Sequence, residues 1–140
     1  LVAGRRVVAS NAAYLKECAI DTLEGVEGGF RDEAELRRAC AAADVGVTSA
    51  AYGLADTGSL VMFSTGEEAR MISLLPPVHV AVLAKERILT GLDELFLRHP
   101  HPGEAASSMV LITGPSRTAD IEQILIRGVH GPGELHVIVV

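Results

Sequence analysis

The segment Val78-His-Val-Ala-Val-Leu83 is almost continuously apolar and follows the pair Pro76-Pro77. A strand that is covered on both faces has such a sequence, because neither of its faces meets solvent. Similar apolar runs occur at residues 44–48, 109–113 and 135–140. These runs predict strands of a buried, mostly parallel sheet.

Further elements surround these strands. Short apolar runs at 6–10, 59–64 and 71–75 predict more strands, and helices are expected over 11–19, 32–43, 90–97 and 118–127. Asp32 can cap the second helix, and Thr90 with Asp93 predicts a capping box in the third. Because strands alternate with helices, we expect an α/β fold with helices flanking the sheet. A hairpin-like middle over 56–84 predicts that the mostly parallel sheet is mixed.

Length, charge and cysteine content exclude several classes of protein. The 140 residues predict one domain, spanning 1–140, and a net charge of −6 opposes binding to a nucleic-acid backbone. Cys18 and Cys40 are too few for a disulfide scaffold or an iron–sulfur cluster. The apolar runs fall short of the roughly 18 residues of a membrane span, and no secretory signal follows Arg5-Arg6. We therefore expect a cytoplasmic protein.

The segment Thr113-Gly-Pro-Ser-Arg-Thr-Ala-Asp120 joins an expected strand to an expected helix. After the turn at Gly114, backbone N–H groups together with Ser116, Arg117 and Thr118 would bind a phosphate or carboxylate. It is not a Walker A loop, because the second glycine and the lysine are missing. The structural alternative is that Ser116 or Thr118 only caps the helix and Arg117 is solvated.

Histidines supply a second group of candidates. His130 lies in Val129-His-Gly-Pro-Gly-Glu134, before the last expected strand, and suits a general acid/base or an anion contact. A structural hydrogen bond is the commoner role of a lone histidine. His79 lies within an apolar strand and is expected in the core. His99 and His101 lack a third ligand, so we expect no metal site.

Asp56 and Thr57 belong to the small-residue segment Ala50-Ala-Tyr-Gly-Leu-Ala-Asp-Thr-Gly58. Small residues let a ligand approach the backbone closely, so both side chains are candidate ligand contacts. They can equally form a turn through side chain to backbone hydrogen bonds. Arg70 could reach the same edge, although a solvated arginine is the simpler interpretation.

Four motifs occur in a fixed order: Gly46-Val-Thr-Ser-Ala-Ala-Tyr-Gly-Leu-Ala-Asp-Thr-Gly58, Ser73-Leu-Leu-Pro-Pro-Val-His79, Thr113-Gly-Pro-Ser-Arg-Thr-Ala-Asp-Ile-Glu122 and Gly128-Val-His-Gly-Pro-Gly133. Together they resemble the lactate-utilisation (LUD) domain family, in particular its LutC/YkgG-type subunits, over about residues 41–140. The resemblance implies a fold like that of the NagB/RpiA/CoA-transferase superfamily. One departure is that Ser49 and Ala51 replace the Gly and Asp of the family's Thr-Gly-Ala-Asp pattern, so a carboxylate with a catalytic role there would be missing.

The resemblance also implies a role in bacterial oxidation of L-lactate to pyruvate, with partner subunits that carry iron–sulfur clusters. This chain has no Gly-x-Gly-x-x-Gly fingerprint, and we expect no cofactor in it. We therefore expect an accessory, non-redox subunit, in which Arg117 pairs with the lactate carboxylate and His130 takes the hydroxyl proton. Two alternatives are a stand-alone enzyme or binder for a sugar phosphate or acyl-CoA, and an interaction surface without a ligand.

Overall fold

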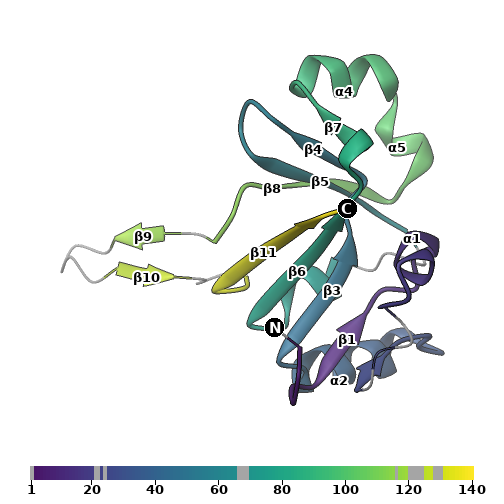
Figure 1. Cartoon of the computed structure of the whole chain (residues 1–140), viewed down its shortest axis with the longest axis vertical. Helices are drawn as coiled ribbons and strands as arrows, with labels where there is room; N and C mark the ends of the chain where they lie inside the picture. Colours follow the sequence, from purple (N-terminus) through teal and green to yellow (C-terminus); the bar gives the residue numbers. More distant parts are fainter. Residues whose placement is uncertain are drawn as a thin grey trace.

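A parallel sheet forms the centre of the chain in the computed structural model, which describes residues 2–20, 23, 25–65, 70–115, 117–119, 125–127 and 131–140. Its strand order is β11-β6-β3-β1-β2, and every neighbouring pair is parallel (Figure 1). The strands are β1 (Val7–Ala9), β2 (Val26–Glu27), β3 (Val45–Ser49), β6 (Val78–Leu83) and β11 (Glu134–Val139). The expected α/β fold with a mostly parallel sheet is confirmed.

Helices cover both faces of this sheet, because alternate residues of its central strands are apolar on each side. Helix α1 (Ala13–Glu17) packs through the buried Leu15 on a face rich in valine. On the other face lie α2 (Glu33–Ala42) and α3 (Arg70–Leu74). Helix α2 begins where its sequence predicts, since the Asp32 carboxylate accepts a 2.7 Å hydrogen bond from the Glu35 N–H.

A second sheet packs against the α3 side of the first and carries the antiparallel pairing. Its order is β7-β4-β5-β8, formed by β4 (Tyr52–Leu54), β5 (Ser59–Ser64), β7 (Ile88–Leu89) and β8 (Ser108–Ile112). Leu60 and Met62 of β5 meet Ala81 and Leu83 of β6 in one core cluster. The hairpin expected over 56–84 therefore does not mix the first sheet, because its strand β5 belongs to the second sheet, whereas β6 runs parallel to its neighbours in the first.

Short helices complete the second sheet. Helix α4 (Leu92–Arg98) buries Leu95 against it, and η2 (Lys85–Arg87) and α5 (Pro102–Ala105) lie in the connections. The prediction that Thr90 pairs with Asp93 is wrong. The Thr90 N–H and hydroxyl donate to the Glu94 carboxylate at 2.8 and 3.0 Å. Gly91 is the N-cap, so Glu94 holds the third helical position, from which a side chain reaches back.

Two expected elements have the wrong type. Residues 71–75 belong mostly to helix α3, because a short apolar run fits a buried helix as well as a strand. Within the expected helix 118–127, the described residues instead form β9 (Arg117–Ala119) and β10 (Leu125–Arg127), an antiparallel pair. Thr118 pairs with Ile126, and β-branched residues favour strands. In the described part of the chain, no helix has the length and apolar character that crossing a membrane requires.

Gly46 is the position at which the first sheet and α3 come closest. A Cβ atom at residue 46 would lie 2.0 Å from the backbone carbonyl oxygen of Ile72, far inside van der Waals contact. Any side chain there must therefore push α3 away from β3.

We expect Gly46→Ala to lower the free energy of unfolding by about 2–3 kcal/mol, because the added methyl overpacks this contact. Gly103→Ala is the matched control, since a Cβ at residue 103 meets nothing within 4 Å. Urea denaturation of both variants measures the difference. Equal stability of the two would show that α3 shifts at no cost.

His79 is a core residue, as its sequence context predicts. Only 1% of it is exposed, and its Nε2 lies 2.7 Å from the hydroxyl oxygen of the fully buried Thr48. Burial lowers the pKa of His79 from 6.5 to about 4. The unfolded chain therefore takes up this proton at a higher pH than the folded chain does.

This pKa difference makes stability depend on pH. The contribution of neutral His79 is complete above pH 6.5 and is lost as the pH falls toward 4, by about 3 kcal/mol at most. His79→Gln keeps a polar neighbour for Thr48 but does not titrate. Between pH 7.5 and pH 4 the wild-type chain should lose about 2–3 kcal/mol more stability than this variant in denaturation curves. Parallel losses would contradict a buried neutral histidine.

Candidate functional site

The direction in which successive strands are added to the parallel sheet reverses at β1, and this reversal marks one position at the carboxyl edge of the sheet. From β1 the chain moves outward to β2 and then returns to place β3 on the other side of β1. In open α/β sheets, ligands bind outside the carboxyl ends of the strands at such a point, because the connections diverge there and leave a crevice. The loop that begins at Ser10 and Asn11 follows β1 at this edge.

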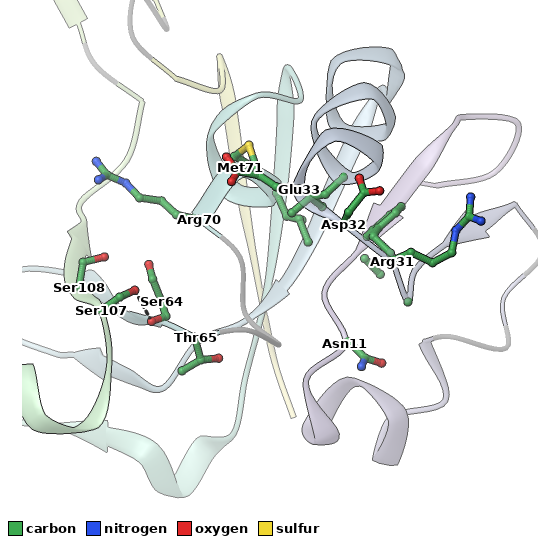
Figure 2. Close-up of a pocket in the computed structure, with 15 residues that line it drawn as sticks. Asn11, Arg31, Asp32, Glu33, Ser64, Thr65, Arg70, Met71, Ser107 and Ser108 are labelled. Carbon is green, nitrogen blue, oxygen red and sulfur yellow. Dashed lines mark hydrogen bonds between the residues drawn. The ribbon is translucent and has the colours of Figure 1, made fainter.

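A cleft of about 640 Å³ opens at this edge, and we name it the edge cleft. One wall consists of Asn11 and the segment 29–33, which leads into α2, and the other of the end of β5, the start of β8 and the first turn of α3 (Figure 2). Phe30, Leu36 and Met71 form an apolar part of its lining and are half-buried. The edge cleft therefore lies where the two sheets and two helices meet.

The start of α2 contributes little free hydrogen-bonding capacity to the edge cleft. Asp32 caps the Glu35 N–H, and the Glu35 carboxylate accepts hydrogen bonds from the Arg31 N–H at 2.9 Å and from its guanidinium at 3.2 Å. These hydrogen bonds from Arg31 hold the pKa of the Glu35 carboxyl below its usual range. Since the side chains near this helix end satisfy one another, an anion would find its donors elsewhere.

Donors gather at the opposite wall. Ser64 and Ser108 are register partners across β5 and β8, so their side chains lie on the same face of the second sheet. Arg70, the first residue of α3, lies on this side of the edge cleft, whereas Asp32 and Glu33 lie on the other (Figure 2). Among the described residues, no carboxylate forms an ion pair with Arg70. The edge cleft thus has Arg70 and the hydroxyls on one side, and on the other side Asp32 and Glu33 beside Arg31, which is paired with Glu35.

A smaller hollow of about 160 Å³ shares Thr65 with the edge cleft. It is lined by Ser49 at the end of β3 and Ala51 just after it, by Ala12 and Ala13 at the start of α1, and by Arg87. The Arg87 guanidinium lies 5.9 Å from the centre of the Tyr14 ring, a cation–π contact. Ser49 and Ala51, where the sequence departs from the family pattern, therefore adjoin the edge cleft.

Asp56 lies in the turn between β4 and β5 and is directed toward the start of α4. A Cβ atom at Gly91 would lie 2.6 Å from an Asp56 carboxylate oxygen, and the Asp56 N–H donates to the Thr90 carbonyl at 3.1 Å. Asp93 lines the same shallow depression. Two carboxylates together disfavour an anionic ligand, so the turn role of Asp56 fits its surroundings better than contact with an anion.

Thr57 and Gly114 lie at one end of the second sheet. The Thr57 hydroxyl donates to the Ser59 hydroxyl at 2.9 Å, and Ser59 lies 3.3 Å from the hydroxyl of Thr113, which precedes Gly114. This end of β5 and β8 is opposite to the end with Ser64 and Ser108. Ser64 is five positions after Ser59 along β5, a distance of roughly 17 Å. The structure therefore brings Thr57 and Gly114 together but places both far from the edge cleft.

Two of the remaining expected site residues belong to the β9–β10 ribbon. Arg117 and Thr118 belong to β9, and the ribbon extends away from both sheets in Figure 1. The backbone there is extended, so the helix start that was expected to bind an anion is not formed at 117–119. Ser116 and His130 lie outside the described residues.

Sequence reasoning missed most of the edge cleft. Asn11 lies two positions after β1, Ser64 ends β5 and Ser108 begins β8, but no motif indicates any of them. Ligands of open α/β sheets bind beyond the carboxyl ends of strands, and for the strand expected over 6–10 this tendency indicates Asn11. The sequence offers Arg70 as a candidate at the edge that carries Asp56, whereas the structure places it in the lining of the edge cleft.

Three comparisons bear on identity. Residues 5–140 match the LUD domain. The uncharacterized protein YkgG of Escherichia coli K12 is 45% identical over 94 residues, covering 64% of this chain and 41% of that protein. Lactate utilization protein C 1 of Bacillus mycoides is 38% identical over 108 residues, covering 74% of this chain and 46% of that protein. This chain thus spans less than half the length of these relatives.

A solved structure agrees on the fold. The crystal structure of a DUF162 family protein from Deinococcus radiodurans superposes with a TM-score of 0.65, covering 97% of this chain and 74% of that one, at 21% sequence identity. At this identity the likeness concerns the fold alone. Because the LUD domain match extends over nearly the entire sequence, this chain belongs to the LUD domain family.

Proposed function

We propose that this domain acts in lactate utilisation, as an accessory, non-redox subunit of a cytoplasmic system that oxidises L-lactate to pyruvate. The observation that carries the proposal is the 38% identity to a protein named lactate utilization protein C 1 over 108 residues. The lactate utilization protein C of Bacillus subtilis, 38% identical over 94 residues, supports the same role.

Electron transfer is assigned to partner subunits with iron–sulfur clusters. A cluster needs about four thiolate ligands, whereas this sequence has two cysteines. Cys40 lies on the buried face of α2 and is completely buried, and burial raises the pKa of its thiol, so it is held as an unreactive thiol in the core. This chain alone has too few thiols to bind a cluster, and the partner would accept the electrons.

We also propose roles for the motif residues of the second half of the chain. Arg117 would pair with the substrate carboxylate, and Ser116, Thr118 and the backbone at Gly114 would add hydrogen bonds. Oxidation of lactate to pyruvate removes two electrons and two protons. His130 would accept the proton of the 2-hydroxyl group, the C2 proton would be released to solvent, and both electrons would pass to the partner.

The first test is purification of the tagged protein from its own lactate-grown cells. An iron-containing protein should accompany it in near-stoichiometric amount, as measured by mass spectrometry and iron assay, and lactate oxidation should require both. An iron-free chain that purifies alone would contradict a stable complex. Turnover of a sugar phosphate or acyl-CoA by the isolated chain would support the stand-alone alternative instead.

The second test concerns the proposed base. His130→Ala should lower lactate oxidation by the complex about 100-fold or more, because a positioned general base contributes at least that factor. His101→Ala is the matched control, since His101 is an exposed residue before α5. Similar activity of the two variants, with the complex intact, would remove His130 from the mechanism.

A third test concerns Arg117. Arg117→Gln should raise KM for lactate about tenfold or more with partner binding unchanged, because a charge-assisted contact to the carboxylate is lost. Arg38→Gln, on an exposed position of α2, is the control. If partner binding falls instead, Arg117 belongs to a docking surface.

A further inference from the structure

We propose that the edge cleft binds an organic oxyanion that is larger than lactate, with its carboxylate or phosphate at Arg70, Ser64 and Ser108 and its apolar body against Phe30, Leu36 and Met71. This binding site does not depend on the role proposed in lactate oxidation. It is also distinct from Gly114, which lies at the opposite end of the second sheet.

The volume of the edge cleft indicates the size of the ligand. At about 640 Å³ it lies in the range of roughly 300–1,000 Å³ typical of sites for drug-sized molecules. Because one water molecule takes about 30 Å³ of liquid, the edge cleft has room for about twenty. A three-carbon acid would fill a small part of this space and leave the apolar lining in contact with water.

Ser64 and Ser108 form a pair of hydroxyls suited to the head group. As register partners in antiparallel strands, their Cβ atoms are about 4.5–5.5 Å apart. Both residues continue the face of Met62 and Val110, which pack in the core between the sheets, so both side chains are directed toward α3. Both are half-buried, and neither hydroxyl bonds to a described residue. The Ser107 hydroxyl, in contrast, is bound to the Ser64 carbonyl at 2.9 Å.

Arg70 supplies the charge for this head group. Its guanidinium lies on the same side of the edge cleft as the two serines (Figure 2). Its backbone position is fixed because α3 packs directly on β3 at Gly46. A planar guanidinium binds two oxygens of one carboxylate or phosphate, and its donors are not taken by a described carboxylate. An oxyanion here would therefore receive a charged donor and two hydroxyls.

The rest of the lining sets the orientation of the ligand. Phe30, Leu36 and Met71 are only half-buried; Phe30 and Leu36 line the wall at the start of α2, and Met71 lines the wall formed by α3. On the far side Arg31 is paired with Glu35, so Asp32 and Glu33 are the charges that repel a second negative group. The ligand should therefore carry its charge at one end and an uncharged, apolar body at the other.

The test uses octanoate and octyl phosphate, with acetate, inorganic phosphate, L-lactate and neutral octanamide as comparisons, all below micelle-forming concentrations. By calorimetry, the eight-carbon anions should bind at least tenfold more tightly than acetate, phosphate or lactate, because burial of two methylenes is enough for about that factor. Octanoate should also bind about tenfold more tightly than octanamide. The stronger of the two eight-carbon anions identifies the head group as carboxylate or phosphate.

Two variants separate the head from the body. Arg70→Gln should remove the preference for octanoate over octanamide, whereas Met71→Gln should weaken both ligands and keep their ratio. Arg38→Gln, on the exposed face of α2, should change neither. Backbone amide shifts of Ser64, Ser108 and Met71 on titration locate the ligand independently of any variant.

Three results would overturn the proposal: octanoate binding no better than acetate, octanamide binding as well as octanoate, or amide shifts confined to other parts of the chain. None of them touches the role in lactate oxidation, which the purification experiment tests. Loss of the complex, in turn, would leave the binding measurements on the isolated chain unchanged.

Discussion

The absence of a side chain at Gly46 is the constraint on which the rest of the structure depends. It lets the backbone of α3 lie directly on β3, with the Ile72 carbonyl where a Cβ would otherwise be. Helix α3 thereby covers one end of the parallel sheet, while the second sheet covers the rest of the same face. The two coverings leave a gap between them at the carboxyl edge, and this gap is the edge cleft. Protein interiors are close-packed and deform little, so a methyl group at this point would alter every wall that α3 supports.

Patterns of apolar residues predicted the parallel sheet well, because β3 and β6 are buried on both faces and allow hardly any polar residue. Capping chemistry predicted α2 from Asp32, since that interaction is local. The type of residues 71–75 could not be predicted in the same way. A run of five residues with four apolar side chains suits a helix or a strand, and the space that Gly46 provides, 26 positions before Ile72, decides between them. The division into two sheets also depends on contacts between distant segments, such as Met62 with Thr48.

Prediction of the site was limited by the same distinction between local and distant information. Motifs rich in glycine and proline drew attention to Thr57 and Gly114, and the structure does place these at one end of the second sheet. The edge cleft has no motif, because its residues come from separate loops and each is ordinary in its own segment. Ser64 and Ser108 lie side by side only because of the register of β5 and β8, and the sequence of neither segment alone specifies that register.

The pairing of β6 with β11 has a consequence for how the chain folds. Val78 is a register partner of Glu134 and Leu83 of Val139, so these two neighbouring strands are among the most distant in the sequence. Closing so long a loop costs chain entropy before any contact repays it, and parallel pairing of this kind is slow. During synthesis, β6 leaves the ribosome well before its partner and presents an open, apolar edge in the interval. β11 therefore covers this edge of β6, and the time before β11 is synthesised sets how long the edge can pair with strands of other chains.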